Sequence, residues 1–250
     1  MTWSSGQKYL AEFLGTFGLL AAVGGAAVFS GLVSGGLLDT SRVVLIAAAL
    51  GFGVLGMAYA FGDVSGGHFN PAITIGFWAS GRFPAREVVP YVLAQVLGGI
   101  TAMGLIAAIA YGGPSDSFAG VQSVALASQG YSGNGAPYAY SVFSVFLIEV
   151  LFTFFLVVVA LLATRSESSS KNLAAIAITM TLFMTNLVAI PVDGASINPA
   201  RSFAPAILSA FWPSGQWAIK EDWIFWVAPI IGGIIAALVE RALRPHGHPA

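Results

Sequence analysis

Long apolar stretches separated by short polar segments dominate the chain. A membrane-spanning helix needs about 20 predominantly apolar residues. Six stretches reach this length, over residues 7–33, 43–61, 86–111, 140–163, 173–192 and 223–243. Two further apolar stretches, residues 71–80 and 199–211, are only about half as long as a span requires. The pattern predicts an all-α membrane protein with six full spans and two half-spans.

Each half-span begins with the same three residues, Asn70-Pro71-Ala72 in the first and Asn198-Pro199-Ala200 in the second. Asn is a preferred N-cap, and proline suits the first helical position, where its missing N–H would be unpaired in any case. Each triplet therefore predicts the capped start of a short helix at membrane depth. Irregular backbone at that depth is tolerated only where it is buried in protein or lines a water-filled cavity. The two triplets predict a pore or a binding site.

Composition supports a membrane protein and excludes several function classes. The chain is 57% hydrophobic and 8% charged, whereas soluble domains have about 25% charged residues. A net charge of -1 gives no basis for binding nucleic acid. There are no cysteines and three histidines, two of them in the tail at His246 and His248, so we expect no metal and no cofactor. No nucleophile–base pair stands out, so we expect no enzyme.

The two halves of the chain resemble each other in the same order. Three pairs of segments match: residues 12–17 with 149–154, residues 70–72 with 198–200, and residues 94–100 with 228–234. Since each half holds three spans, the second half inserts upside down. We expect one channel domain over residues 1–250, made of inverted repeats over about residues 7–111 and 140–243. Inverted repeats with broken helices at matching positions place a site at the membrane midplane.

In this arrangement the two half-helices meet there, N-terminus to N-terminus. Each end carries about half a positive charge from the helix dipole. Two such ends facing one point repel cations and protons, a device that selective membrane pores use. The Asn70 and Asn198 amides offer N–H donors to an acceptor such as water.

The distribution of basic residues predicts the orientation in the lipid bilayer. Segments on one side hold seven Lys and Arg residues, and those on the other side hold Arg42 and Lys220. The seven are Lys8, Arg82, Arg86, Arg165, Lys171, Arg241 and Arg244. The positive-inside rule places both termini in the cytoplasm.

The doubled triplet, with the stretch Ser65-Gly66-Gly67-His68-Phe69-Asn70-Pro71-Ala72 and with Asn198-Pro199-Ala200-Arg201-Ser202, resembles the major intrinsic protein (aquaporin) family. Within it, the bacterial water channels of the aquaporin Z kind are the most similar. The resemblance covers essentially the whole chain. It implies an aquaporin-like bundle, a homotetramer with one pore per subunit, and a place in the plasma membrane, the inner membrane of a bacterium.

The resemblance also implies a selectivity filter. Arg201 would form the outer constriction, together with Leu50, Asn186 and Ala195 at the family's filter positions. Strict water channels carry Phe and His at the first two of these positions, and glycerol facilitators carry Trp and Gly with Phe at the third. This chain matches neither, and its smaller side chains suggest a wider, less polar ring. Ser202, Ala206 and the pair Phe225-Trp226 resemble the water branch.

Several residues keep two interpretations. Glu12 and Glu149 are intramembrane carboxylates, which often relay protons; the family resemblance implies instead that they bind N–H groups of the two re-entrant loops. His68 lines the inner vestibule or caps a loop. Asn186 lines the pore or ties two helices together. Asp63 and Asp193 flank the two loops, where solvation and gating are the alternatives.

We therefore expect a passive channel for water that excludes protons and ions and also passes small neutral solutes. One alternative is a facilitator for glycerol, urea or ammonia with minor water flux. Another is a secondary transporter, because inverted repeats and broken helices also occur in that class. A transporter needs a coupling-ion site, and the half-helix ends would repel a cation.

Overall fold

The computed structural model describes residues 2–33, 38–114, 120–122, 125–134, 136, 138–165, 168 and 171–244. In this part of the chain, six helices are long and apolar enough to cross a membrane. They are α1 (Ser5–Val33), α2 (Thr40–Ser65), α4 (Ala85–Tyr111), α6 (Val142–Ala163), α7 (Ala174–Asp193) and α10 (Ile224–Ala242), the last preceded by a short helical segment. The six predicted spans are confirmed.

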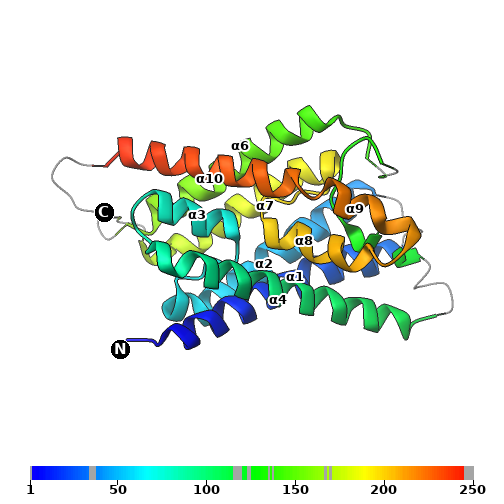
Figure 1. Ribbon diagram of the computed structural model, residues 1–250, viewed down its shortest axis with the longest axis horizontal. Helices are drawn as coiled ribbons and strands as arrows, with labels where there is room; N and C mark the ends of the chain where they lie inside the picture. Colours follow the sequence, from blue (N-terminus) through cyan, green and yellow to red (C-terminus); the bar gives the residue numbers. More distant parts are fainter. Residues whose placement is uncertain are drawn as a thin grey trace.

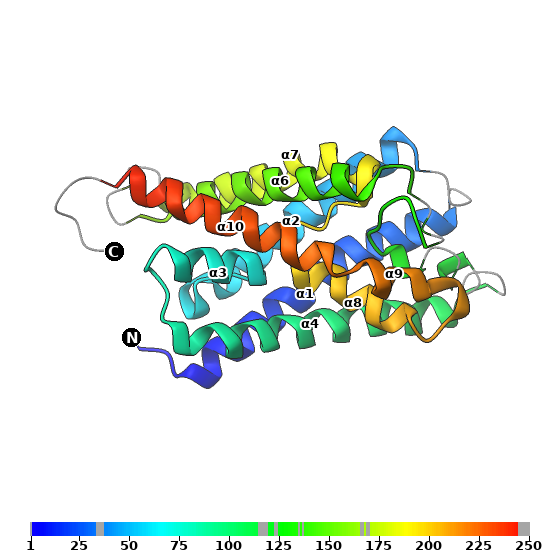
Figure 2. The same cartoon turned by 45° about the horizontal axis from the view of Figure 1, so that its top comes forward.

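Two short helices, α3 (Pro71–Ala79) and α8 (Pro199–Ser209), lie inside the bundle of long helices. Figure 1 and Figure 2 show α3 in the half nearer the chain termini and α8 in the opposite half. Both are half-helices that start at the predicted Asn-Pro-Ala triplets. The predicted aquaporin-like bundle is therefore confirmed as the fold.

Two long helices continue further than the sequence pattern predicts. α2 ends at Ser65 rather than near residue 61, and α7 includes Asp193, which we expected in a loop. Both helices stop at a glycine in the left-handed region, Gly66 with φ 96° and Gly194 with φ 87°. Each glycine N–H closes the last helical turn, on the carbonyls of Gly62 and Ile190. Glycine adopts this conformation without a Cβ penalty, so it sets the true helix end.

The predicted external loop over residues 212–222 is in fact partly helical. It forms η3 (Pro213–Gly215) and α9 (Gln216–Glu221). Trp217 and Ala218 of α9 are buried in a small hydrophobic cluster with Ala125 and Ala206. Burial of this apolar face stabilises a helix that the sequence pattern alone does not predict.

The long polar segment between α4 and α6 contains η1 (Ala125–Ala127), and η2 (Lys171–Leu173) precedes α7. Predicted features in residues 34–37, in residues 115–119 and in the histidine-containing tail lie outside the described residues.

Glycine allows the closest helix contacts in the bundle. A Cβ atom on Gly98 of α4 would overlap the carbonyl oxygen of Phe13 in α1. A Cβ atom on Gly232 of α10 would overlap the carbonyl oxygen of Val150 in α6 in the same way. Small residues that let backbones approach are typical of helix packing in membranes. The contacts α1–α4 and α6–α10 are therefore equivalent in the two halves.

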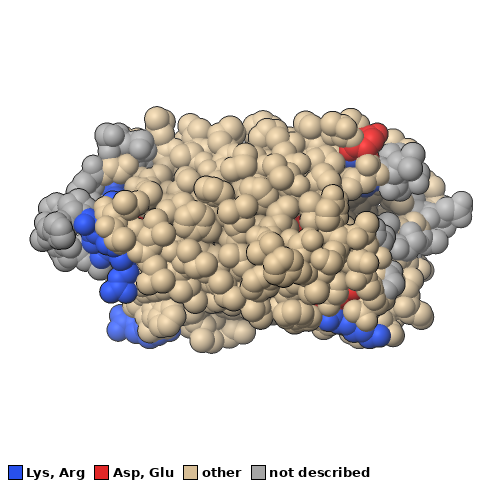
Figure 3. Space-filling model, turned by 90° about the horizontal axis from the view of Figure 1, so that it is seen from above, with Lys and Arg blue, Asp and Glu red and all other residues tan. Residues whose placement is uncertain are grey.

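Charged side chains gather at the two ends of the molecule. Figure 3 shows Lys and Arg at the end with the termini, a second group at the far end, and an almost uncharged region between them. Both chain termini lie at the same end (Figure 1). Arg241 and Arg244 donate there to the carbonyls of Ala79 and Ser80 at the end of α3. Cationic donors at this position stabilise the negative end of a helix dipole.

The glycine contacts give a test of the packing. We expect Gly98→Ala to lower the free energy of unfolding by about 1–3 kcal/mol, because the added methyl forces α1 and α4 apart. Gly104→Ala, in the same helix, is the matched control, since nothing lies within 4 Å of its Cβ position. It should change stability by at most about 1 kcal/mol, in the stabilising direction. Unfolding followed by circular dichroism in mixed detergent micelles measures both, and equal losses would contradict the packing argument.

Candidate functional site

The two loops that lead into α3 and α8 follow the same backbone path. We call residues 66–69 the first loop and residues 194–197 the second loop. Left-handed φ angles occur four, three and one residues before each capping Asn. They are Gly66 (96°), Gly67 (66°) and Phe69 (48°) in the first loop and Gly194 (87°), Ala195 (54°) and Ile197 (57°) in the second. Three of the six residues are not glycine, and such strain persists only where surrounding contacts hold it.

Two buried carboxylates provide these contacts. Glu12 of α1 and Glu149 of α6 are both 0% exposed. Each accepts two consecutive N–H groups of one loop, one on each oxygen: His68 (2.9 Å) and Phe69 (2.7 Å) on Glu12, Ser196 (2.7 Å) and Ile197 (2.7 Å) on Glu149. Hydrogen bonds to ionised groups are about twice as strong as neutral ones. This geometry fits the interpretation that Glu12 and Glu149 support the two loops. It uses both oxygens of each carboxylate as acceptors.

The two loops also bind each other through the capping asparagines. Asn70 Nδ2 donates to the carbonyl of Ile197 at 2.8 Å, and Asn198 Nδ2 donates to the carbonyl of Phe69 at 2.9 Å. This reciprocal contact is where α3 and α8 meet, N-terminus to N-terminus. An amide nitrogen carries two hydrogens, so each Asn keeps one further N–H donor at the meeting point.

The side-chain oxygen atoms of the same two asparagines cap the half-helices. Asn70 Oδ1 accepts the N–H of Ala72 at 2.8 Å, and Asn198 Oδ1 accepts the N–H of Ala200 at 3.0 Å. Pro71 and Pro199 occupy the first helical positions, where no N–H donor is needed. One asparagine side chain therefore starts the half-helix and also fixes it to the opposite loop.

Several supporting residues of the first loop were missed by the sequence prediction. The Ser65 hydroxyl donates to Glu12 at 2.6 Å, and Gln95 Nε2 donates to Glu12 at 2.7 Å and to Thr74 Oγ1 at 3.0 Å. The Tyr91 hydroxyl donates to the Ser65 carbonyl at 2.8 Å. Gln95 had a signal in the sequence, since an amide at membrane depth needs a partner. Its counterpart in the matched segment of the second half is Pro229.

His68 is packed rather than free. Its ring lies 4.9 Å from the rings of Phe77 and Phe83 and 5.5 Å from that of Tyr91, centroid to centroid. Its Nδ1 lies 3.1 Å from Thr74 Oγ1. The residue is 6% exposed. These contacts hold the His68 ring in one orientation beside the first loop. A His68 side chain at the wall of the inner vestibule would therefore present a fixed ring rather than a mobile one.

Arg201 in the first turn of α8 has buried donors without protein partners. Its Nη2 donates to the carbonyl of Gly194 at 2.9 Å. Its Nε and Nη1 are buried and have no partner among the described residues. Buried N–H groups are nearly always paired with protein or with ordered water. The free side of this guanidinium therefore faces a place for water or a solute.

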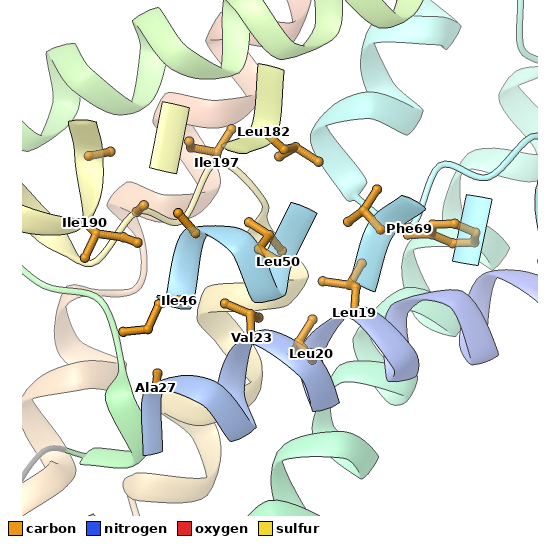
Figure 4. Close-up of a cluster of buried hydrophobic side chains, with 14 of the residues drawn as sticks. Leu19, Leu20, Val23, Ala27, Ile46, Leu50, Phe69, Leu182, Ile190 and Ile197 are labelled. Atoms are coloured by element: carbon orange, nitrogen blue, oxygen red, sulfur yellow. The ribbon is translucent and has the colours of Figure 1, made fainter. Parts of the chain in front are cut away.

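Leu50, Asn186 and Ala195, the other expected filter residues, are all buried. Leu50 of α2 lies among Leu19, Val23 and Leu182 in the main hydrophobic cluster (Figure 4). Ala195 lies in the second loop and is held there by its own N–H bond, described below. Among the described residues, no hydrogen bond joins Leu50 or Asn186 to Arg201.

The Asn186 side chain bonds its own helix. Its Nδ2 donates to the Leu182 carbonyl at 2.9 Å, one turn earlier in α7. Its Oδ1 is buried and has no partner among the described residues. No described hydrogen bond from this side chain crosses to another helix, so the helix-tie interpretation finds no support.

A cavity lies beside Arg201. Its lining includes Leu20, Val23, Ala27, Met103, Gln129 and Arg201. Gln129 Oε1 is also buried without a partner among the described residues. The cavity thus has apolar walls with a few free polar atoms. No group of three His, Cys, Asp or Glu residues that could hold a metal ion occurs in the described part of the chain.

Asp63 and Asp193 occupy different environments. Asp63 of α2 is exposed, whereas Asp193 at the end of α7 is 0% exposed. Solvation therefore explains Asp63 and does not explain Asp193.

A six-span bundle with two half-helices that meet head-on defines a membrane channel rather than an enzyme. Comparison with known proteins gives the family: the chain belongs to the major intrinsic protein family, whose sequence model matches residues 1–240. It is 40% identical over 240 residues to aquaporin Z of Rhodopseudomonas palustris, covering 96% of this chain and 94% of that protein. It is 40% identical over 238 residues to aquaporin Z of Bradyrhizobium diazoefficiens, covering 95% and 93%.

A solved structure, that of the aquaglyceroporin from Plasmodium falciparum, has the same fold. Its TM-score is 0.77 at 21% sequence identity, over 96% of this chain and 97% of that one. At this identity the likeness concerns the fold alone.

The support of the first loop can be tested at Glu12. We expect Glu12→Gln to lower the free energy of unfolding by about 3 kcal/mol, because the amide replaces one of two acceptor oxygens with a donor and leaves a buried N–H unpaired. Water permeability should fall with it. Glu87→Gln is the matched control, since Glu87 pairs with Tyr9 near the surface at 2.7 Å and should lose less than about 1 kcal/mol. Unfolding curves in detergent measure the free energy of unfolding of both variants. Equal losses for Glu12→Gln and Glu87→Gln would show that Glu12 does not hold the loop.

Proposed function

We propose that the protein is a passive channel for water. The observation that carries this proposal is a set of buried polar atoms without protein partners around the two loops. Among the described residues, no donor reaches the carbonyl oxygens of Ala195 and Ser196, although these residues are 0% and 2% exposed. The free Nε and Nη1 of Arg201 and the free Oδ1 of Asn186 belong to the same set. Buried polar groups of this kind require water.

The same geometry supports exclusion of cations and protons. The N-termini of α3 and α8 face the meeting point of Asn70 and Asn198, and each contributes about half a positive charge. The remaining N–H of each amide donates to the oxygen of a water molecule at the meeting point. The asparagine amides offer that water donors and no acceptor, because their oxygens cap the half-helices. Arg201 adds a full positive charge. Positive half-helix ends of this kind exclude protons in aquaporin-type pores.

The filter composition supports a broader solute range. The relatives cited above carry the name aquaporin Z, and Ser202 and Ala206 resemble the water branch. At the first two filter positions, Leu50 and Asn186 leave more room than the Phe and His of strict water channels would. Arg201 offers free donors and Asn186 a free acceptor, so the ring suits neutral solutes that both donate and accept, such as urea or glycerol. We therefore include small neutral solutes in the proposed function.

The remaining parts of the proposal concern assembly and orientation. We propose one channel domain formed by inverted repeats over about residues 7–111 and 140–243, and the equivalent loops support this. Six of the seven basic residues counted on this side of the membrane stand at helix ends or turns at the end of the bundle that holds the termini: Lys8, Arg82, Arg86, Arg165, Arg241 and Arg244. This distribution favours a cytoplasmic location for that end. A homotetramer in a bacterial inner membrane is what the aquaporin Z relatives suggest.

Stopped-flow light scattering on proteoliposomes tests the channel. We expect osmotic water permeability well above that of empty liposomes, a low activation energy, and no dependence on a proton gradient. Saturable, gradient-driven uptake would instead support a secondary transporter. Running glycerol, urea, ammonia and hydrogen peroxide in the same assay defines the solute range.

The filter can be narrowed by two substitutions. We expect Leu50→Phe with Asn186→His to reduce glycerol and urea flux by about tenfold or more while water permeability is retained, since specificity at a pocket responds to steric changes of this size. Leu45→Phe, at an exposed site of the same helix, is the control and should change nothing. If the unmodified protein already excludes glycerol, urea and ammonia, the wide-filter proposal is wrong.

A further inference from the structure

Asp193 is a fully buried carboxyl group beside the second loop, and none of the roles above uses it. Its Oδ1 accepts the N–H of Ala195 at 2.7 Å. Its Oδ2 is buried and receives no donor from the described residues. A carboxylate oxygen left in this state would be strongly destabilising, because burial removes its hydration. The free oxygen therefore needs an explanation.

Among the described residues, the groups around Asp193 supply no donor to its Oδ2. Tyr138, from the segment before α6, gives its hydroxyl proton to the Ser128 carbonyl at 2.8 Å. Ser196 gives its own to the Asn198 carbonyl at 3.0 Å. Arg201 of α8 directs Nη2 to the Gly194 carbonyl, and its other nitrogens are unpaired. A further neighbour is Glu149 of α6. It accepts the N–H groups of Ser196 and Ile197, directly after the Ala195 N–H that Asp193 accepts, so the two carboxyl groups are brought together on three consecutive N–H groups of one loop.

Two carboxyl groups in contact form a hydrogen bond only if one of them carries a proton. Glu149 already accepts two loop N–H groups, one on each oxygen, and both bonds require an acceptor. Asp193 therefore is the better place for the proton, on its unpaired Oδ2. Two ionised carboxylates in one buried site repel each other strongly, so a single shared proton is the stable arrangement.

The first half of the chain supports the same assignment. Ser65 stands five residues before Asn70, as Asp193 stands five residues before Asn198. The Ser65 oxygen accepts the N–H of Gly67 at 3.1 Å, and its hydroxyl donates to Glu12 at 2.6 Å. Asp193 accepts the N–H of Ala195 in the same way. Ser65 thus makes two bonds, one as acceptor and one as donor to the loop-supporting glutamate. Asp193 can make the same two bonds only if its Oδ2 carries a proton and donates it to Glu149.

The pair acts on Arg201 through one peptide bond. Asp193 holds the N–H of Ala195, while Arg201 binds the carbonyl of Gly194 at 2.9 Å. These two groups belong to the same peptide unit, so fixing its N–H also fixes its carbonyl. We propose that Asp193 is a positioning residue: a protonated carboxylic acid that donates to Glu149 and orients the peptide on which the Arg201 guanidinium is anchored.

The proton also sets the local charge. With Asp193 neutral, the positive charge of Arg201 is balanced by Glu149 alone. Loss of the proton would leave a net negative charge in the second loop, next to the groups that repel cations. This second consequence rests on the proposed water-channel function, because it concerns the exclusion of cations and protons.

Infrared spectroscopy tests the proton directly. We expect the spectrum of the unmodified protein minus that of Asp193→Asn, recorded at neutral pH in lipid, to show the C=O stretch of a buried carboxylic acid. Asp63→Asn is the matched control, since Asp63 is exposed, and its difference spectrum should lack the band. Absence of the band at Asp193 would overturn the assignment. This readout does not depend on which solutes pass, so it fails or succeeds separately from the proposed function.

Permeability separates positioning from simple packing. Asn and Ser at position 193 each offer an acceptor for Ala195 and a neutral donor for Glu149, so Asp193→Asn and Asp193→Ser should keep water permeability and proton exclusion. Asp193→Ala should lose water permeability about tenfold, or admit protons about tenfold faster, as expected for the loss of one buried hydrogen bond. Circular dichroism and gel filtration in detergent establish that each variant is folded. If Asn and Ser fail as Ala does, or Ala behaves as the unmodified protein, the positioning role is wrong.

Discussion

The structure depends on how two stretches of irregular backbone are satisfied at membrane depth. Lipid offers no hydrogen-bonding groups there, so each loop N–H that does not face water has to find a partner within the protein. Glu12 and Glu149 provide it, each with one oxygen for each of two consecutive N–H groups. A charge buried for this purpose is costly, and it is retained because the ionised acceptor stabilises a strained loop that neutral groups would hold less firmly. Everything at the pore centre follows from these two loop conformations.

Once the loops are fixed, the half-helices have little freedom. Asn70 and Asn198 each cap their own helix and bind a carbonyl of the opposite loop, so the separation of α3 and α8 is set by two short hydrogen bonds. Arg82, Arg241 and Arg244 bind carbonyls at the termini end of the bundle, the last two at the end of α3. The positive ends are thereby held toward the centre, and the negative end of α3 meets cationic donors. A fixed dipole is useful for selectivity because it needs no rearrangement when a solute arrives.

Much of this arrangement could be predicted from the sequence, because it is encoded in local patterns. Apolar length gives the spans, and the Asn-Pro pairs give the starts of the half-helices. Long-range partners are different. Gln95 and Tyr91 carry no local signal that names Glu12 or Ser65 as a partner, and α9 forms because Trp217 finds a buried place. The left-handed conformations of Phe69 and Ile197 were likewise not predictable, because side chains of this kind ordinarily avoid them. Partners distant in the sequence hold them there: the carboxylates bind their N–H groups and the capping asparagines bind their carbonyls.

The two halves differ in a way that concerns charge. Three residues after the capping Asn, the first half has Ile73 and the second has Arg201; five residues before it, the first half has Ser65 and the second has Asp193. The extra cation and the extra carboxyl group thus occur together, on the two helices that flank the second loop and around the same peptide bond. A fixed guanidinium in a buried wall needs a rigid acceptor, and a rigid carbonyl needs its N–H partner held in turn. A neutral acid meets this need without adding a second negative charge beside Arg201, which an ionised carboxylate in the same place would do.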